Sequence, residues 1–240
     1  MKVVVVGAGG FMGTKLVDML AREGEEVVPA SRRSGVDVLT GAGLARALAG
    51  ADALVDVTNA PSFDPEELTD FFRTGTTNMV AAARAAGVKH FVELSIVGVD
   101  ALPDSPYMRA KTAQERLITG SGVPYTIVRA TQFHEFAGTI VDSLTDGDDV
   151  RVPDAMIQPI AGDEVAAFLA EVAVEAPRNH IVNIGGPERL SFADLARAVV
   201  ARRHGSQTVA VDPDARYFGA RLKPDSLVTG PGAMLGSIEF

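Results

Sequence analysis

The sequence predicts an α/β fold with a doubly wound parallel sheet and a small C-terminal lobe. Apolar runs of strand length alternate with longer helical patterns, as in repeated strand–helix–strand units. The first run, residues 2–7, is β-branched and continuous, which is typical of a parallel strand buried on both faces. A glycine-rich stretch follows this run directly and opens the first helical pattern. Together these three observations predict the parallel sheet and its crossover helices.

The other elements follow in order along the chain. Strands are expected over residues 26–31, 52–58, 90–98, 125–130 and 180–186. Helices are expected over residues 11–24, 65–87, 105–117, 162–176 and 191–203, and the first two end at glycines. Asp163 and Ser191 are the candidate N-caps of the last two helices. A further short strand is expected just before Asp37.

The chain is interpreted as a single domain over residues 1–240, in which residues 131–160 and 185–240 contribute a small lobe. With 47% hydrophobic and 22% charged residues, the composition is that of an ordinary globular protein with a sizeable core. No linker, internal repeat or low-complexity tract divides the chain. The scattered Pro and Gly residues after position 205 make the C-terminal part less regular than the rest.

Composition excludes several classes of function. The formal net charge of −9 argues against a nucleic-acid-binding protein, which needs a basic face. The absence of cysteine removes disulfides, thiolate nucleophiles and cysteine zinc sites, and it fits a cytoplasmic protein. His90, His180 and His204 are scattered, so no metal site is expected. No apolar stretch is long enough to span a bilayer, so no membrane partner is expected.

The glycine-rich stretch has the spacing of a dinucleotide-binding loop. Gly7, Gly10 and Gly13 follow a G-x-x-G-x-x-G pattern between a strand and a helix. Glycines permit a tight turn and let backbone N–H groups approach a pyrophosphate at the helix N-terminus. The sequence therefore predicts a Rossmann-type NAD(P)-binding domain, and the alternative is a glycine-rich turn without a ligand. The expected cofactor contacts in this loop are Gly7, Gly9, Gly10, Phe11, Met12 and Gly13.

The end of the second strand indicates which cofactor is preferred. Folds specific for NAD place an acid here for the ribose 2′-hydroxyl, whereas this chain has Ser31, Arg32 and Arg33. Arginine pairs well with a 2′-phosphate, so NADP(H) is expected over NAD(H). The alternative is a solvated basic turn. Asp37 is a candidate acceptor for the adenine amino group, although a lone surface acid would look the same.

The turn after the 52–58 strand completes the expected cofactor site. In an open α/β sheet, ligands lie beyond the carboxyl ends of the strands at the topological switch point. Thr58, Asn59 and Ala60 are thereby placed beside the ribose or the nicotinamide. The alternative is a plain loop.

Five stretches in this order give the chain a family resemblance over nearly all of its length. It resembles the short-chain dehydrogenase/reductase superfamily, particularly its atypical, NmrA-like branch of NAD(P)-binding proteins. The stretches are VVVVGAGGFMG, DVTNAPS, AARAAGVKHFVELSIVGVD, YMRAKTAQERLI and VPYTIVRATQFHEF. The combination is specific for cofactor binding and much less so for the reaction, because the branch contains both reductases and cofactor-sensing regulators.

The resemblance implies catalytic roles for Ser95, Tyr107 and Lys111. Tyr107 would donate a proton to a substrate carbonyl that Ser95 orients, and Lys111 would hold the nicotinamide ribose. A lysine suits this chemistry because a nearby ammonium lowers the pKa of a tyrosine from its usual value near 10. Tyr107 and Lys111 are four residues apart and share one helix face, so the alternative is an ordinary helix surface.

One family feature is missing. The superfamily often has an asparagine in the long central helix, and the matching position here holds Phe72. A proton relay through that asparagine would be absent. Asn78 lies elsewhere in the family pattern.

The loop after the 125–130 strand is the expected substrate pocket. Phe133, His134 and Phe136 would form an apolar wall with one titratable group, and Met156 with Gln158 would close the same cleft. The alternative for His134 is a packed or exposed side chain without a ligand.

The leading hypothesis is an NADPH-dependent oxidoreductase that reduces a small carbonyl or quinone-like molecule, with Tyr107 as proton donor. The runner-up is a non-enzymatic NADP(H)-sensing regulatory protein that binds a partner. A third and weaker hypothesis is a nucleotide-sugar epimerase that uses bound NAD. The arginines after the second strand and the short C-terminal lobe do not favour it. Helical faces in this fold often form dimers, so a homodimer is one expected state.

Overall fold

The computed structural model describes all of residues 1–240 and divides into two compact units. Unit 1 comprises residues 1–95, 110–129 and 165–182. Unit 2 comprises residues 96–109, 130–164 and 183–240. Unit 2 therefore contains the residues expected to form the C-terminal lobe, together with the segment 96–109.

Seven strands form the central sheet in the order β12-β9-β5-β4-β3-β1-β2. The pairs β1–β2, β1–β3 and β3–β4 are parallel, and Val4 aligns with Val28 on one side and Leu54 on the other. The chain reverses its direction of progress across the sheet at β1 and β3, which makes this the switch point of a doubly wound fold. The predicted parallel α/β sheet is confirmed. Its strands are β1 (Lys2–Val6), β2 (Glu26–Ala30), β3 (Ala53–Asp56), β4 (His90–Ile96), β5 (Tyr125–Ala130), β9 (Ile181–Gly185) and β12 (Met234–Leu235).

Residue types explain the positions of the strands in the sheet. Val3–Val6 are almost fully buried, because β1 lies in the middle of the sheet and is covered on both faces. Pro29 lies in β2, which is the edge strand, where a residue without an N–H group is tolerated.

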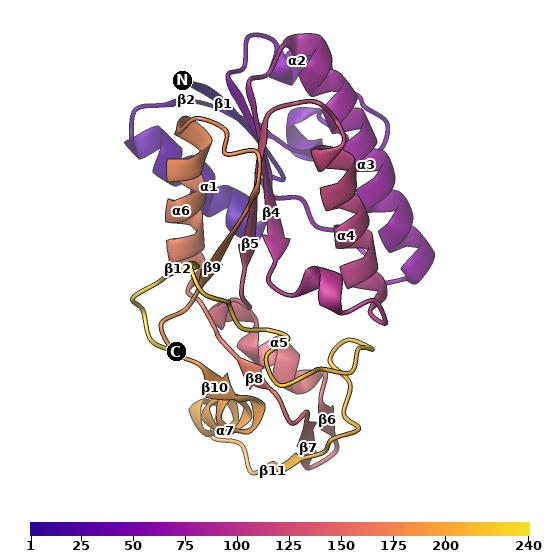
Figure 1. The fold of residues 1–240 in the computed structure, drawn as a ribbon, viewed down its shortest axis with the longest axis vertical. Coiled ribbons are helices and arrows are strands. Elements are labelled where there is room, and N and C mark those ends of the chain that lie inside the picture. The colour runs from indigo at the N-terminus through magenta and orange to yellow at the C-terminus, as the bar shows by residue number, and fades with distance from the viewer. The chain divides into compact units, whose positions relative to one another are not determined.

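Helices cover both faces of the sheet. Figure 1 shows α1 (Phe11–Arg22) and α6 (Gly162–Val174) on one face, and α3 (Pro65–Ala86) and α4 (Pro106–Thr119) on the other. The Asp64 side chain caps α3 by accepting from two backbone N–H groups, and Gly87 ends it with a φ of 69°. The short helix α2 (Leu44–Leu48) packs against α3.

Unit 2 has its own apolar core and smaller sheets. A three-stranded sheet has the order β11-β7-β6, and β8 pairs with β10. Phe192 of α7 is among the most buried side chains of this core. The elements are α5 (Ala137–Asp142), β6 (Thr145–Asp146), β7 (Asp149–Val152), β8 (Met156–Ile157), β10 (Leu190–Ser191), α7 (Phe192–Arg202) and β11 (Thr208–Val211), with 3₁₀ turns η2 (Val99–Ala101) and η3 (His134–Phe136).

Three local predictions need correction. No strand precedes Asp37: the chain forms the 3₁₀ turn η1 (Arg32–Ser34), and Gly35 then has a φ of 78°, outside strand geometry. The helix α2 was missing from the predicted elements. Asp163 lies inside the first turn of α6, which begins at Gly162, so it is not the N-cap; Ser191 does cap α7, accepting from a backbone N–H.

None of the helices combines the length and the apolar character needed to cross a membrane.

Candidate functional site

The glycine loop joins β1 to α1 in a turn that only glycine accommodates at two positions. Gly7 has a φ of 89°, and a Cβ there would lie 2.8 Å from the backbone oxygen of Val57. A Cβ at Gly13 would lie 2.1 Å from the backbone oxygen of Gly7. These two glycines are required by close packing of the protein itself. At Gly9, by contrast, the nearest atom is 3.9 Å away, in the side chain of Ser31.

A substitution at Gly9 can therefore test cofactor binding without disturbing the fold. The Gly9→Ala variant is expected to unfold at the wild-type temperature, because no protein atom obstructs the new methyl group. It is expected to bind NADPH at least about tenfold more weakly, because the loop backbone must approach the pyrophosphate closely. Thermal unfolding and calorimetric titration measure the two effects.

Two companion variants bracket this result. Gly13→Ala meets a backbone oxygen and is expected to destabilise the fold by about 1–3 kcal/mol. Gly230→Ala has nothing within 4 Å and should change neither property. Wild-type NADPH affinity in Gly9→Ala would mean that no ligand approaches this face of the loop.

The turn after β2 presents two basic side chains to solvent. Ser31 and Ser34 form a reciprocal capping box, which holds η1 at the carboxyl end of β2. Arg32 and Arg33 are exposed, and neither forms an ion pair with an acidic side chain. Asp37 has its carboxylate directed to the backbone N–H groups of two following residues, at 2.8 and 3.4 Å, which is a local turn role.

The turn after β3 lies against the glycine loop. The Ala8 N–H donates to the carbonyl of Ala30 at the end of β2, and a Cβ at Gly7 would meet the backbone of Thr58 at 2.9 Å. Three of the predicted cofactor segments thus meet at the carboxyl ends of β1, β2 and β3. Within this turn, the Asn59 side chain accepts from the N–H of Ala60 at 3.0 Å.

A buried polar network supports the Thr58 turn. Asp56, at the end of β3, accepts from the Thr58 N–H and from the Gln114 side chain, each at 2.9 Å. The Gln114 carbonyl oxygen in turn accepts from the ammonium of Lys111. Lys111 also donates to Glu93 and, at 2.9 Å, to the carbonyl of Leu94. The network therefore links Lys111 to a predicted cofactor-binding turn.

Lys111 is buried in a way that the sequence alone does not reveal. Its side chain is 3% exposed, and its Nζ lies 5.0 Å from the centre of the Phe72 ring. Phe72, at the sequence position where the resemblance implies an asparagine, therefore lies beside this lysine. The ammonium of Lys111 is thus surrounded by hydrogen-bond acceptors.

Burial dominates the charge state of Glu93. Removal from water raises the pKa of this carboxyl well above its usual range, and the neighbouring Asp56 raises it further. The Lys111 ammonium acts in the opposite direction, lowering the pKa. Asp56 and Glu93 are register partners on adjacent strands, which brings the two carboxyl groups together.

Ser95 is buried at the end of β4, and its hydroxyl already donates a hydrogen bond within the protein. Its hydroxyl donates to Glu115 Oε1 at 2.6 Å. Arg129 donates two hydrogen bonds to the same carboxylate, from Nε to Oε1 at 2.9 Å and from Nη2 to Oε2 at 2.7 Å. The pair has the bidentate geometry of strong charge-assisted bonds, so Glu115 fixes the orientation of Ser95.

Tyr107 belongs to unit 2, whereas Ser95 and Lys111 belong to unit 1. Tyr107 is the second residue of α4, one turn before Lys111, and packs half-buried against the core of unit 2. It is close enough to Tyr217 for its charge to influence the pKa of that residue.

The five expected pocket residues all lie in unit 2, three of them in one loop. Gln158 is buried, and its side-chain amide is bonded to the backbone of Gly186 and Thr229. The rings of Phe133 and Phe136 are 5.6 Å apart, and His134 contacts the ring of Phe240 edge-on at 5.3 Å. Phe136 is exposed, and the Nε2 atom of His134 is buried without a hydrogen-bond partner. Met156 lies in β8, paired with Ser191. The structure thus groups the aromatic residues and places Met156 on a separate strand.

Five polar residues of these buried networks were not predicted: Asp56, Glu93, Gln114, Glu115 and Arg129. Glu93 and Glu115 had a recognisable signal: one lies two residues before Ser95 on the same strand face, and the other lies four residues after Lys111 on the same helix face. No spacing pattern pointed to Asp56 or Arg129, whose side-chain partners Gln114 and Glu115 are distant in sequence.

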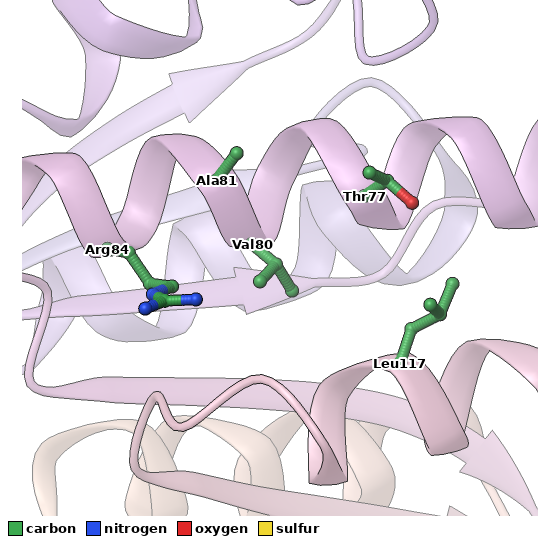
Figure 2. A pocket seen from close by; sticks show the side chains of 5 residues that line it. All are labelled: Thr77, Val80, Ala81, Arg84 and Leu117. Carbon is green, nitrogen blue, oxygen red and sulfur yellow. The ribbon is translucent and has the colours of Figure 1, made fainter.

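Two further features lie apart from these residues. No group of three or more His, Cys, Asp or Glu side chains is arranged to hold a metal ion. A hollow of about 240 Å³ lies on the surface of α3 and α4 and contains none of the predicted site residues (Figure 2). Its lining consists of Thr77, Val80, Ala81, Arg84 and Leu117.

Comparison with known proteins gives a family and several relatives. A family model described as NAD(P)H-binding matches residues 29–176. A (4-alkanoyl-5-oxo-2,5-dihydrofuran-3-yl)methyl phosphate reductase from Streptomyces griseus subsp. griseus is 30% identical, over 92% of this chain and 82% of that enzyme. A chloroplastic divinyl chlorophyllide a 8-vinyl-reductase from Oryza sativa subsp. indica is 31% identical over 77% of this chain, which spans only 54% of that enzyme.

A solved structure with a similar fold covers nearly the whole chain. The dTDP-4-dehydrorhamnose reductase from Clostridium acetobutylicum matches with a TM-score of 0.73 over 98% of this chain and 95% of its own. The two sequences are 19% identical, so this likeness concerns the fold.

Proposed function

This chain belongs to the NAD(P)H-binding family, and we propose that it is an NADPH-dependent oxidoreductase that reduces a small carbonyl or quinone-like substrate. The observation that carries the proposal is the convergence of the glycine loop, the Ser31 turn and the Thr58 turn at the ends of three adjacent strands. Ligands of open α/β sheets bind at this location. The space at Gly9, which no protein side chain fills, fits the close approach of a pyrophosphate.

The preference for NADPH rests on the turn after β2. Arg32 and Arg33 are exposed cations without an acidic partner, and Ser31 stands where an NAD-specific fold has an acid. A guanidinium forms short, directional hydrogen bonds with phosphate oxygens. A 2′-phosphate would thus gain at least one charge-assisted contact that NADH lacks.

Titration with NADPH, NADP, NADH and NAD tests this part of the proposal. Replacing both arginines by alanine is expected to weaken NADPH binding about 10- to 100-fold, the worth of a hydrogen bond to a charged group, and to leave NADH binding unchanged. Arg22→Ala is the matched control, because Arg22 is also exposed but ends α1 away from the strand ends. Equal losses for NADPH and NADH would contradict a role in 2′-phosphate recognition.

The reduction needs a proton as well as a hydride, and NADPH would supply the hydride when bound. We assign the proton to Tyr107, because a phenol at the start of α4 combines a transferable proton with a half-buried position. Ser95 already donates to Glu115, so it meets a substrate oxygen only by exchanging that bond. Lys111 acts through Gln114 and Asp56 on the Thr58 turn, which makes it a positioning residue in this proposal.

A redox-sensing regulatory protein is the second candidate. The observation in its favour is that the polar atoms of Ser95 and Lys111 are already bonded within unit 1. Such a protein would bind NADPH and NADP with very different affinities and pass the difference to a partner. It would not depend on the hydroxyl of Tyr107.

A further inference from the structure

The arginine turn, residues 31–34, is followed directly by a closed loop of residues 35–43 in unit 1. At the start of the loop, the Val36 N–H donates to the carbonyl of Ser31 at 2.9 Å. The N–H of the next residue donates across the loop to the carbonyl of Ala42, also at 2.9 Å. The loop is therefore closed on itself and bonded to the arginine turn.

The two ends of this loop pack on each other without room for a side chain. Gly43 has a φ of 75°, and a Cβ there would lie 2.1 Å from the carbonyl oxygen of Gly35, the residue that ends the arginine turn. From the following helix α2, the Arg46 guanidinium donates to the carbonyl of Ser34 at 3.3 Å. A movement of the loop is therefore passed to the backbone of the arginine turn.

One side chain of the long helix α3 holds the middle of the loop. The amide nitrogen of Asn78 donates to the carbonyl oxygens of Val38, at 2.8 Å, and Leu39, at 3.0 Å. The amide nitrogen carries two hydrogens, so these bonds use both. One turn earlier on α3, a Cβ at Gly75 would lie 3.1 Å from the Val38 side chain, so the absence of a side chain there lets the loop approach the helix. The loop is thus clamped to α3.

The arginine turn has few contacts of its own to fix it. Arg32 and Arg33 are exposed, and none of residues 32–34 is buried. A long side chain loses conformational freedom when it binds a ligand, and a backbone that must be ordered at the same time adds to this cost. A turn whose backbone is already held in place therefore binds a phosphate more tightly than a mobile one.

We propose that Asn78 is a positioning residue for recognition of the 2′-phosphate of NADPH. It acts through the loop of residues 35–43, which holds the arginine turn in place before the cofactor binds. NADH has no 2′-phosphate for Arg32 and Arg33 to hold, so its binding depends less on this turn. The assignment rests on the proposed NADPH-dependent function and adds a residue that controls the choice of cofactor.

Calorimetric titration with NADPH and NADH compares the wild type with Asn78→Leu. Leucine has nearly the volume of asparagine but no N–H group. The variant is expected to bind NADPH about 5- to 10-fold more weakly, the worth of about one net hydrogen bond, and to bind NADH within about twofold of the wild type. Thr77→Val is the matched control, because Thr77 is exposed and its hydroxyl donates to the carbonyl of Arg73 in the same helix. It should retain both affinities.

A second variant reaches the arginine turn from the other end of the loop. Gly43→Ala places a methyl group against the carbonyl of Gly35 and should also weaken NADPH binding more than NADH binding. Amide hydrogen exchange of the cofactor-free protein reports the cause. Residues 31–40 are expected to exchange at least about fivefold faster in both variants, whereas β1 should exchange as in the wild type. Either variant alone decides the question if the other does not fold.

The outcomes separate the role of Asn78 from the proposed function. A wild type that binds NADPH no more tightly than NADH overturns the proposed cofactor preference and this assignment with it. A wild type that prefers NADPH, and keeps its full preference in Asn78→Leu, overturns the role of Asn78 alone. Equal losses for the two cofactors also overturn that role, because they would show that Asn78 serves only the fold of unit 1. Faster exchange of residues 31–40 with an unchanged preference has the same meaning.

Discussion

Tyr107→Phe is expected to lower kcat at least about 100-fold while NADPH still binds with wild-type affinity. The substitution removes only the phenolic oxygen and therefore the proton that the proposed mechanism transfers. The remaining ring keeps the packing of Tyr107 against the core of unit 2. Loss of turnover without loss of binding is the pattern of a group that acts in the transition state.

The measurement is NADPH consumption with a panel of small ketones, aldehydes and quinones, together with calorimetry of NADPH binding. Tyr125→Phe is the matched control, because it removes the same atom from a tyrosine in β5. Wild-type turnover in Tyr107→Phe would show that another group donates the proton. A wild type that is inactive on the whole panel but strongly discriminates NADPH from NADP would favour the redox-sensing candidate.

Lys111→Met is expected to lower the free energy of unfolding by about 3–5 kcal/mol. Methionine keeps most of the side-chain volume beside Phe72 but removes the ammonium from Glu93 and Gln114. Removing one partner of a buried ion pair leaves the other charge without compensation, which is more harmful than removing both. Urea unfolding measures the loss.

The loss is expected to grow from acid to neutral pH. The pKa of Glu93 is raised, so its contribution to stability is fully present below about pH 4.3, the value for an unfolded glutamate, and is lost as the pH rises through the folded pKa. The Lys111 ammonium lowers that folded pKa. In Lys111→Met the pKa of folded Glu93 rises further, which widens the pH range over which stability falls. The variant therefore loses more stability at neutral pH than at acid pH.

The control for this variant is an exposed lysine. Lys89 is 77% exposed and pairs with Asp52 at 3.1 Å, so Lys89→Met should change stability by less than about 0.5 kcal/mol. If Lys111→Met were as stable as the wild type at every pH, the buried network would not contribute to folding. The ribose contact implied by the family resemblance would then be the better account of Lys111.

Local residue patterns were sufficient for the order of the main elements and for the cofactor loop. The valine run of β1, the glycine spacing from Gly7 to Gly13 and the helix end at Gly87 each depend on neighbouring residues alone. The predicted strand before Asp37 was wrong because a serine capping box and glycines with positive φ overrode a weak apolar signal. The predicted boundaries of other elements differ from the observed ones by a few residues, because residues at their ends lie in turns rather than in regular helix or strand.

The sequence by itself determined the α/β class, the parallel sheet and the location of the glycine loop, because these follow from periodicity and from turns between residues close together in the chain. Only the tertiary structure decided that Lys111 is buried against Glu93, that Ser95 donates to Glu115, and that Arg129 holds the carboxylate of Glu115. The physical reason is that burial and hydrogen-bond partners depend on segments that meet only after folding. Asp56 and Gln114 are 58 residues apart along the chain, and no local pattern records their contact.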